Sequence, residues 1–429
     1  MKKYIFLLGV LILTLPGFSQ NNYGLRFSNL LNDNLTLENA IRLGLENNSD
    51  FLTAKEEITI AEQRLSEAKF RYLPQFALQG TATWYNADSP LVLPEAGINR
   101  LLPASKDLDS NQFYGVGVTA TQYLYSGGRI RGTLKIARAN LKQVQSRYET
   151  VKNSIVLDIK RSFANLLYAQ QNVKFTEQLW KQVSKGTFST DILTRVRQKA
   201  ILSHIKTQYN QAQSELAKAR LQMLVSLNKE LNAPLTISGD LEPVSVSGDL
   251  PHFQLWATEF RPELKSAIYA LELDNIAIDL ALSKRYPDVL LNASYERVGD
   301  SDLSDENKQV SLAVRLPIPY TFSQQVNQKK AEQKKSTLRR SAIEDKIHIQ
   351  VASSFEQMHF WQQEAQAQQE IYQELTALLG RAAKTAARHD LATLEAYREY
   401  LQVGQDYLQA LRENHIAKAQ LEWAIGKDL

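Results

Sequence analysis

The side chains that could carry out chemistry are scattered along the chain without the spacing that catalysis or metal binding requires. The chain contains six histidines and no cysteine. The histidines are His204, His252, His348, His359, His389 and His415. None of them has the spacing of a paired metal-ligand motif. The absence of cysteine excludes disulfides, thiolate metal sites and a lipidated N-terminal cysteine. We therefore predict no metal site and no enzyme, since no nucleophile, base and metal ligand are grouped as a hydrolase needs.

One glycine-containing stretch matches a dinucleotide-binding fingerprint only in its letters. Residues 115–120 read Gly-Val-Gly-Val-Thr-Ala. In a true site the glycines follow a strand and open a helix that holds the phosphates. Here Gly115 and Gly117 alternate within an expected strand, so we predict no cofactor. The formal charge of +4 and the 22% of charged residues, of both signs, also argue against a nucleic-acid surface.

The N-terminus has the features of a secretory signal. Lys2 and Lys3 precede an apolar run over residues 4–15, followed by the small residues Gly17 and Ser19. We expect cleavage after Ser19, which makes residues 1–19 a signal peptide. The alternative is a membrane anchor, but the run is shorter than the ~18 apolar residues of a spanning helix, and no later segment reaches that length. The exported chain is then periplasmic, secreted or an outer-membrane barrel.

One stretch of sequence occurs twice, 213 positions apart. Residues 68–78 and 281–291 each combine a helix-period segment, a proline and a segment of period two. The prolines, Pro74 and Pro287, end a helix and favour an extended chain, so each copy is a helix-to-strand junction. The same offset aligns residues well upstream, for example Ala54 with Ala267. The sequence therefore predicts an internal duplication.

Four segments alternate between apolar and polar residues and are expected to be strands. They are residues 75–85, 114–125, 289–296 and 310–316. The apolar positions expected to face lipid are Phe76, Leu78, Val116, Val118, Val289, Leu291, Leu312 and Val314, and Leu124 is expected on the same face of its strand. The positions expected to face water are Gln79, Thr81, Thr119, Asn292, Ser294 and Arg315. Alternation over ~9–11 residues with aromatic ends suits a membrane barrel, and by itself it also suits a soluble sheet.

The remaining segments have helical periodicity. We expect a helix over residues 35–72 that is capped by Thr36 and broken near 47–49, then two long helices per repeat. The first pair is residues 129–185 and about 190–232, with Ser189 or Thr190 as the cap. The second pair is about 323–388 and a helix that ends at Gly426. The helix over 129–185 would be ~85 Å long, far beyond a globular helix.

These elements give a domain division and an assembly. We expect a first repeat over residues 20–234, a linker over 235–260 and a second repeat over 261–429. Four strands cannot close a barrel, and unpaired strand edges are not tolerated in lipid. Three copies would supply twelve strands with room for a lumen, and twelve long helices would extend the wall into the periplasm.

With this combination of features, the sequence resembles a known family, the outer-membrane efflux proteins or TolC-like channels. The resemblance rests on residues 35–40 (Leu-Thr-Leu-Glu-Asn-Ala), the Leu73-Pro74 junction, residues 125–129 (Tyr-Ser-Gly-Gly-Arg), residues 186–193 and residues 417–424. It implies a mainly α fold with a transmembrane β-barrel. This is a trimeric 12-stranded barrel with four strands per chain, continued by a long α-helical barrel of paired hairpins. The chain departs from the family pattern in residues 320–323 and at His389-Asp390.

The resemblance also implies site residues at the helix tips far from the barrel. Asp191, Glu395 and Arg398 match the region that closes the periplasmic aperture, and we expect them to line it and to favour cations. The alternative is that they are exposed charges that pair locally, which contributes ~0–1 kcal/mol. The hairpin tips are expected to dock the adaptor, through Gly186, Ser189, Thr190, His389, Asp390 and Thr393.

The function implied by the resemblance is a passive exit duct in the outer membrane of a Gram-negative bacterium. The duct would serve a tripartite efflux or type I secretion system. Its partners would be a periplasmic adaptor (membrane fusion) protein, an inner-membrane transporter such as an RND or ABC pump, and outer-membrane lipid. The alternative is a periplasmic coiled-coil adaptor or scaffold, whose strands would form a small soluble sandwich. The sequence does not identify the cargo.

Overall fold

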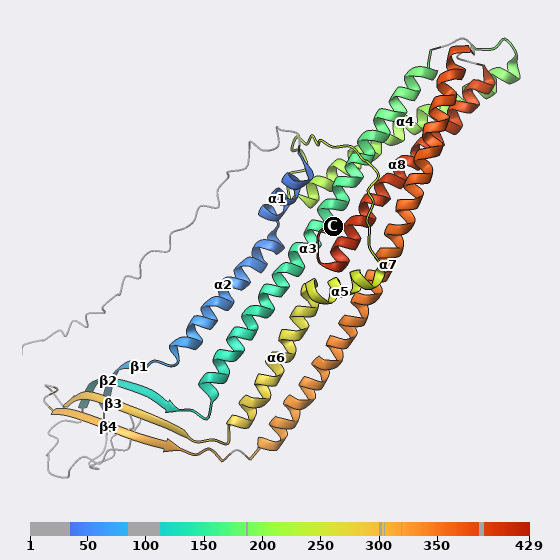
Figure 1. The fold of residues 1–429 in the computed structure, drawn as a ribbon. Helices are drawn as coiled ribbons and strands as arrows, with labels where there is room; N and C mark the ends of the chain where they lie inside the picture. The colour runs from blue at the N-terminus through green and yellow to red at the C-terminus, as the bar shows by residue number, and fades with distance from the viewer. Residues whose placement is uncertain are drawn as a thin grey trace, which may run out of the picture.

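The computed structural model describes residues 35–84, 112–185, 188–299, 303, 305–318, 320–385 and 390–429. The predicted signal peptide, Gly186 and His389 lie outside these residues. The molecule is elongated, with four strands at one end and the tips of two long helical hairpins at the other (Figure 1). No helix in the described ranges combines the length and the hydropathy that crossing a membrane requires.

The first repeat follows the predicted order of elements. It consists of α1 (Leu37–Asn47), α2 (Ser49–Phe70), β1 (Gln75–Trp84), β2 (Gln112–Tyr125), α3 (Arg129–Val183) and α4 (Ile192–Ser226). Thr36 caps α1, since its hydroxyl accepts a hydrogen bond from the Asn39 N–H. Asn48 separates α1 from α2 because its side chain accepts from the N–H groups of Asp50 and Phe51, which starts a new helix. The predicted break near residues 47–49 is confirmed.

The second repeat has the same order. It consists of α5 (Leu250–Phe260), α6 (Pro262–Ser283), β3 (Asp288–Gly299), β4 (Asp305–Arg315), α7 (Phe322–Thr385) and α8 (Leu391–Ile425). Both α5 and α6 begin and end 213 positions after α1 and α2. Helix α5 lies within residues 235–260, which the sequence assigned to a linker. We therefore propose that the second repeat starts at Leu250 and that the linker is the segment before it.

The strands form one antiparallel sheet in the order β1-β2-β3-β4. Directly paired residues share a face, and Leu78 pairs with Val118, which in turn pairs with Tyr295. The register places all eight residues predicted to face lipid on one face and all six predicted to face water on the other. A register shift between Tyr123 and Tyr125 removes Leu124 from this alternation, which simple period-two counting could not detect.

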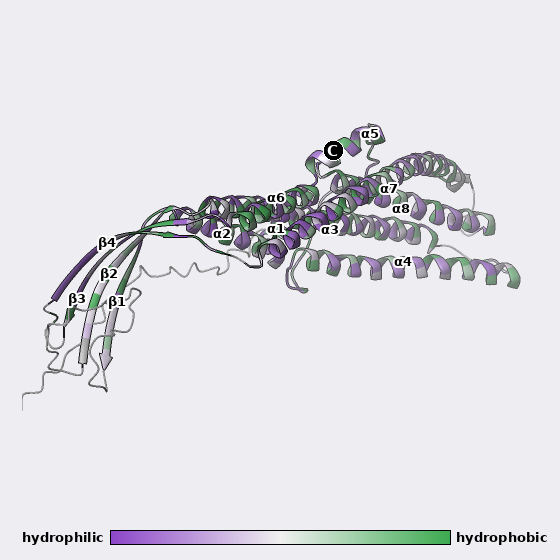
Figure 2. Cartoon of the chain, turned by 90° about the horizontal axis from the view of Figure 1, so that it is seen from below, coloured by the Kyte–Doolittle hydropathy of each residue, from purple (hydrophilic) through white to green (hydrophobic). Residues whose placement is uncertain are grey.

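The helices continue from the strands as a curved layer in which α2, α3, α6 and α7 lie side by side (Figures 1 and 2). Farther from the sheet, α4 and α8 pack against α3, and α8 also packs against α7. Buried clusters fill these contacts, for example around Ile159 and Leu227, and around Phe253 and Leu421. The long helices are therefore held by tertiary packing rather than by intrinsic propensity.

Helices α3 and α8 approach closely where α8 has a glycine. A Cβ added at Gly404 would clash with the ring of Phe175. That ring contacts Tyr372 and Tyr400 edge-on, and Tyr400 donates a hydrogen bond to the Tyr372 hydroxyl. Burial, followed by this hydrogen bond, raises the pKa of Tyr372 well above its usual value, so the phenol stays neutral. The glycine thus allows an aromatic cluster to join α3, α7 and α8.

Candidate aperture at the helix tips

The tip of the first hairpin is an ordered turn tied to the start of α4. The Ser189 N–H donates to Gln198 Oε1 at 3.0 Å, and the Arg195 side chain donates to the Ser189 carbonyl at 2.9 Å. Gln198 is buried, so the turn is anchored to the interior of the hairpin. Thr190 follows in the same turn and is exposed.

Asp191 is the residue that caps α4, in place of the predicted Ser189 or Thr190. Its Oδ2 accepts from the Thr194 N–H at 2.8 Å, and its own N–H donates to the Ser189 hydroxyl. Hydrogen bonds from the side chain and backbone of Thr194 hold the pKa of Asp191 below its usual value. An exposed carboxylate that caps a helix N-terminus stays ionised at neutral pH. Asp191 therefore presents a fixed negative charge at the tip.

At the tip of the second hairpin, some of the predicted site residues are buried and others are exposed. Asp390 precedes α8, and its carbonyl accepts from the Leu394 N–H at 3.0 Å, whereas its side chain makes no capping bond. Thr393 and Leu394 are buried. Glu395 and Arg398 are exposed. Thr393 therefore supports the tip from inside, while the charged residues face outward.

Arg398 is paired with its sequence neighbour rather than with Glu395. Its guanidinium donates to Glu399 Oε1 from Nη2 at 2.7 Å and from Nε at 3.1 Å. The two side chains are 50% and 66% exposed, so water screens the pair. Among the described residues, no hydrogen bond or ion pair connects Asp191 with Glu395 or Arg398. The structure leaves these three groups on the tip surface of one chain.

A buried cluster beneath the tips fixes the direction of these charges. It contains Leu179 and Val183 from α3, Ile201, Leu202 and Ile205 from α4, and Leu394, Tyr397 and Leu401 from α8. The buried residues of α8 are three and four positions apart, so they occupy one helical face. Glu395 and Arg398 lie outside that buried face and are exposed. The packing of three helices therefore sets where the charges point.

The first tip also carries an apolar surface that the sequence analysis did not single out. Ile192, Leu193 and Val196 expose 74%, 74% and 60% of their surface, and we call these three residues the tip patch. Three large apolar residues that are exposed within the first two turns of one helix are typical of a contact surface. Their spacing at the start of α4 was visible in the sequence, but exposure depends on which face of α4 packs inward.

The comparisons with known proteins bear on this arrangement. Residues 40–233 match the family model described as outer membrane efflux protein. The predicted resemblance to the outer membrane efflux proteins is therefore confirmed over this part of the chain. The match covers the first repeat, and the offset of 213 positions relates the second repeat to it. No curated protein matches the sequence.

Solved structures share the fold of this chain over almost its whole length. One of them is CusC, whose crystal structures concern folding and transmembrane channel formation. It has 18% identity and a TM-score of 0.71, with 91% of this chain and 92% of that chain covered. The open state of the MtrE outer membrane channel of Neisseria gonorrhoeae has 18% identity and a TM-score of 0.73, with coverages of 91% and 89%. The CmeC outer membrane channel of Campylobacter jejuni has 15% identity and a TM-score of 0.69, with coverages of 94% and 90%.

At these identities the likeness concerns the fold. The four strands and the two long helical hairpins of this chain match those of channels with a β-barrel part and a helical barrel. Among the described residues, no group of three or more His, Cys, Asp or Glu side chains could hold a metal ion. The prediction of a mainly α chain with one four-stranded sheet is confirmed.

Proposed function

We propose that three copies of this chain form an outer-membrane channel that serves as the exit duct of a tripartite efflux or type I secretion system. The observation that carries the proposal is the sheet, which has one apolar face and two outer edges without a partner in the described residues. On the apolar face, Phe76, Leu78 and Val310 expose 74–79% of their surface. Such a face requires lipid or protein to cover it.

Closure by other copies satisfies both features at once. An open sheet edge is not stable in hydrocarbon, so β4 of one copy must pair with β1 of the next. Three copies give twelve strands, which is enough to surround a lumen, whereas the eight strands of two copies would be filled by side chains. The polar face of each sheet, with Thr119, Asn292 and Ser294, would then line the pore.

The helices supply matching surfaces for the same closure. Helix α7 exposes Leu338, Ile349, Phe360 and Ile371, which we call the α7 stripe. These residues recur every eleven positions, close to three helical turns, so they form one nearly straight line along the helix. Because α7 directly follows β4, pairing of β4 with the neighbour's β1 brings the stripe beside the neighbour's outer helices.

The outer helices on the opposite side of the chain expose apolar residues as well. Leu52 and Ile60 are exposed on α2, and Leu221 and Val225 are exposed on α4. Helix α2 directly precedes β1, which places it at the edge that the next copy's β4 would join. A head-to-tail contact of this kind closes into a ring when the rotation is 120°.

The channel itself is tested by conductance in planar lipid bilayers. We expect the purified trimer to form ion-conducting pores that favour cations, since Asp191 and Glu395 would be repeated three times around the aperture. In the double variant Asp191→Asn/Glu395→Gln, single-channel conductance should rise. The cation-to-anion permeability ratio should fall by about two- to fivefold, since water and salt in the pore partly screen these charges.

The matched control removes an exposed carboxylate on another face of α2, in Glu62→Gln, and should leave both quantities unchanged. Unchanged conductance and selectivity in the double variant would remove Asp191 and Glu395 from the aperture. Absence of any pore from correctly assembled protein would contradict the channel function itself.

The tips are proposed as the docking site of the adaptor, and the transporter would be reached through that adaptor. A photocrosslinking residue at Thr190 or Asp390 should capture the adaptor in cells, because these residues lie just before α4 and α8, which begin at the end of the molecule far from the sheet (Figure 1). The same probe at Asn307 in β4 should capture none. Capture at Asn307 but not at the tips would place the adaptor at the wrong end of the molecule for this proposal.

A further inference from the structure

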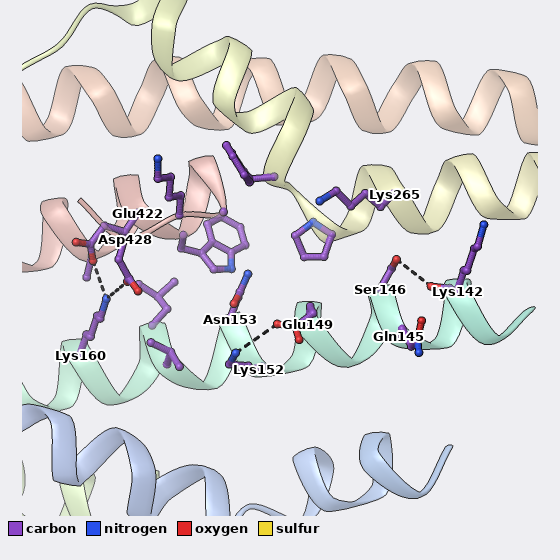
Figure 3. A pocket seen from close by; sticks show the side chains of 18 of the residues that line it. Lys142, Gln145, Ser146, Glu149, Lys152, Asn153, Lys160, Lys265, Glu422 and Asp428 are labelled. Atoms are coloured by element: carbon purple, nitrogen blue, oxygen red, sulfur yellow. Dashed lines mark hydrogen bonds and ion pairs between the residues drawn. The ribbon is translucent and has the colours of Figure 1, made fainter. Parts of the chain in front are cut away.

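A basic cleft of about 460 Å³ lies where α8 ends beside α3 and α6 begins. Figure 3 shows it between these helices, with lysines from both walls directed into it. Five lysines and three carboxylates line it. The helical tips and the sheet are both remote from this cleft, so the channel proposal does not assign it a role.

The carboxylates of the cleft are already paired. Lys160 Nζ donates to Glu422 Oε2 and to Asp428 Oδ1, each at 2.7 Å. Burial alone would lower the pKa of Lys160, but these two partners outweigh burial and raise it. Lys152 lies 3.4 Å from Glu149. The acidic groups therefore offer little to a cationic ligand.

Three other lysines have no carboxylate partner. Lys142 comes from α3, Lys265 from α6 and Lys427 from the residues after α8, and within the described part of the chain none of them forms an ion pair. Each ammonium lies over an aromatic ring instead, at 5.5, 5.9 and 4.2 Å from the centroids of Tyr269, Phe260 and Trp256 respectively. These ring contacts position the ammonium groups without neutralising them.

Neutral donors accompany the three lysines. The side-chain amides of Gln145 and Asn153 line the same cleft and form no hydrogen bond with another described residue. An amide NH₂ can donate two hydrogen bonds. The cleft thus combines three positively charged ammonium groups, which come from three different segments, with two side-chain amides that can donate hydrogen bonds. These groups suit an anion that carries several acceptor oxygens on more than one side.

We propose that this cleft binds a small polyvalent phosphate compound, which would join α3, α6 and the C-terminal residues. Lysine suits phosphate as a point charge. Lys142 and Lys160 lie thirteen and thirty-one residues after the start of α3, or ~20–46 Å along the helix. That distance from the strands favours a soluble phosphate over a lipid headgroup. The cleft also lies between α3 and α6, inside the layer, and so away from the edges where other copies would pack.

The test is calorimetric titration of the full-length protein in nonionic detergent with inorganic tripolyphosphate at constant ionic strength. We expect one binding event per chain, and a rise in unfolding temperature on saturation. The triple variant Lys142→Gln/Lys265→Gln/Lys427→Gln should bind at least about tenfold more weakly. The control Lys218→Gln removes an exposed lysine on α4 and should bind like the parent.

Equal binding by the triple variant and the parent would overturn the site, as would equal weakening by Lys218→Gln. Circular dichroism and oligomeric state of the triple variant show whether its fold is intact, and the single variant Lys265→Gln gives a milder second measurement. A parallel titration with dihexanoyl phosphatidate tests the lipid source, and tighter binding than tripolyphosphate would overturn the assignment to soluble phosphate. Because the cleft lies within one chain, this outcome is independent of pore formation.

Discussion

The double variant Ile349→Glu/Phe360→Glu is expected to lose the trimer and to elute as a monomer in detergent. Both side chains lie on the α7 stripe and expose 70% and 55% of their surface in the single chain. Burying two such residues contributes about 3–6 kcal/mol at each interface. The variant loses this contribution and would also bury carboxylates without partners, which is strongly unfavourable. Light scattering coupled to size-exclusion chromatography measures the change.

The control keeps the stripe apolar, in Ile349→Met/Phe360→Met, and should remain trimeric because the volume changes are small. Val225→Glu, on α4 at the opposite edge of the chain, should weaken the trimer as well. A trimer of Ile349→Glu/Phe360→Glu that is as stable as the parent would show that α7 does not face a second copy. Circular dichroism of the monomer should retain the helical signal, since these residues are not in the core.

Replacing Arg261 with methionine is expected to lower the free energy of unfolding by about 3–5 kcal/mol. Arg261 is 3% exposed and donates to both carboxylate oxygens of Glu263. It also donates to the carbonyls of Trp423 and Ala424 at the end of α8, and to Gln350 Oε1 on α7 at 3.0 Å. Its removal leaves these acceptors without their partner, and disconnects α6 from the end of α8.

Chemical unfolding monitored by circular dichroism measures this decrease in the free energy of unfolding. Arg261→Lys should recover only part of the stability, since an ammonium cannot reproduce the planar set of donors. The control Arg71→Met removes an exposed pair with Glu67 at 3.4 Å and should cost about 0–1 kcal/mol. If the Arg261→Met and Arg71→Met losses were equal, the buried arginine would have no special structural role.

Arg261 also shows how far the duplication can be followed by sequence alone. The offset of 213 positions pairs Arg261 with Asn48, and each is the N-cap of its helix. Asn48 caps α2 with its own side chain, whereas Arg261 makes no capping bond and instead reaches α7 and α8. The repeat predicts the helix boundary, but the role of the boundary residue depends on neighbours that only the second copy has.

Other differences have similarly local causes. Helix α5 was assigned to the linker because Leu250-Pro251 follows a segment with glycine and proline; proline is, however, favoured in the first turn of a helix. The register shift between Tyr123 and Tyr125 removes Leu124 from the alternation of the sheet, and nothing in the pattern of apolar residues indicates it.

The sequence by itself determined the four strands, the long helices, their order, the duplication and the two faces of the sheet, but it missed α5. These follow from period, proline position and turn residues, which act within a few residues of the chain. Only the tertiary structure decided which face of α4 and α8 is exposed at the tips, that Arg261 is buried, and that Lys142, Lys265 and Lys427 share a cleft. These features join residues more than a hundred positions apart, and their positions follow from the packing of whole helices, which no local pattern records.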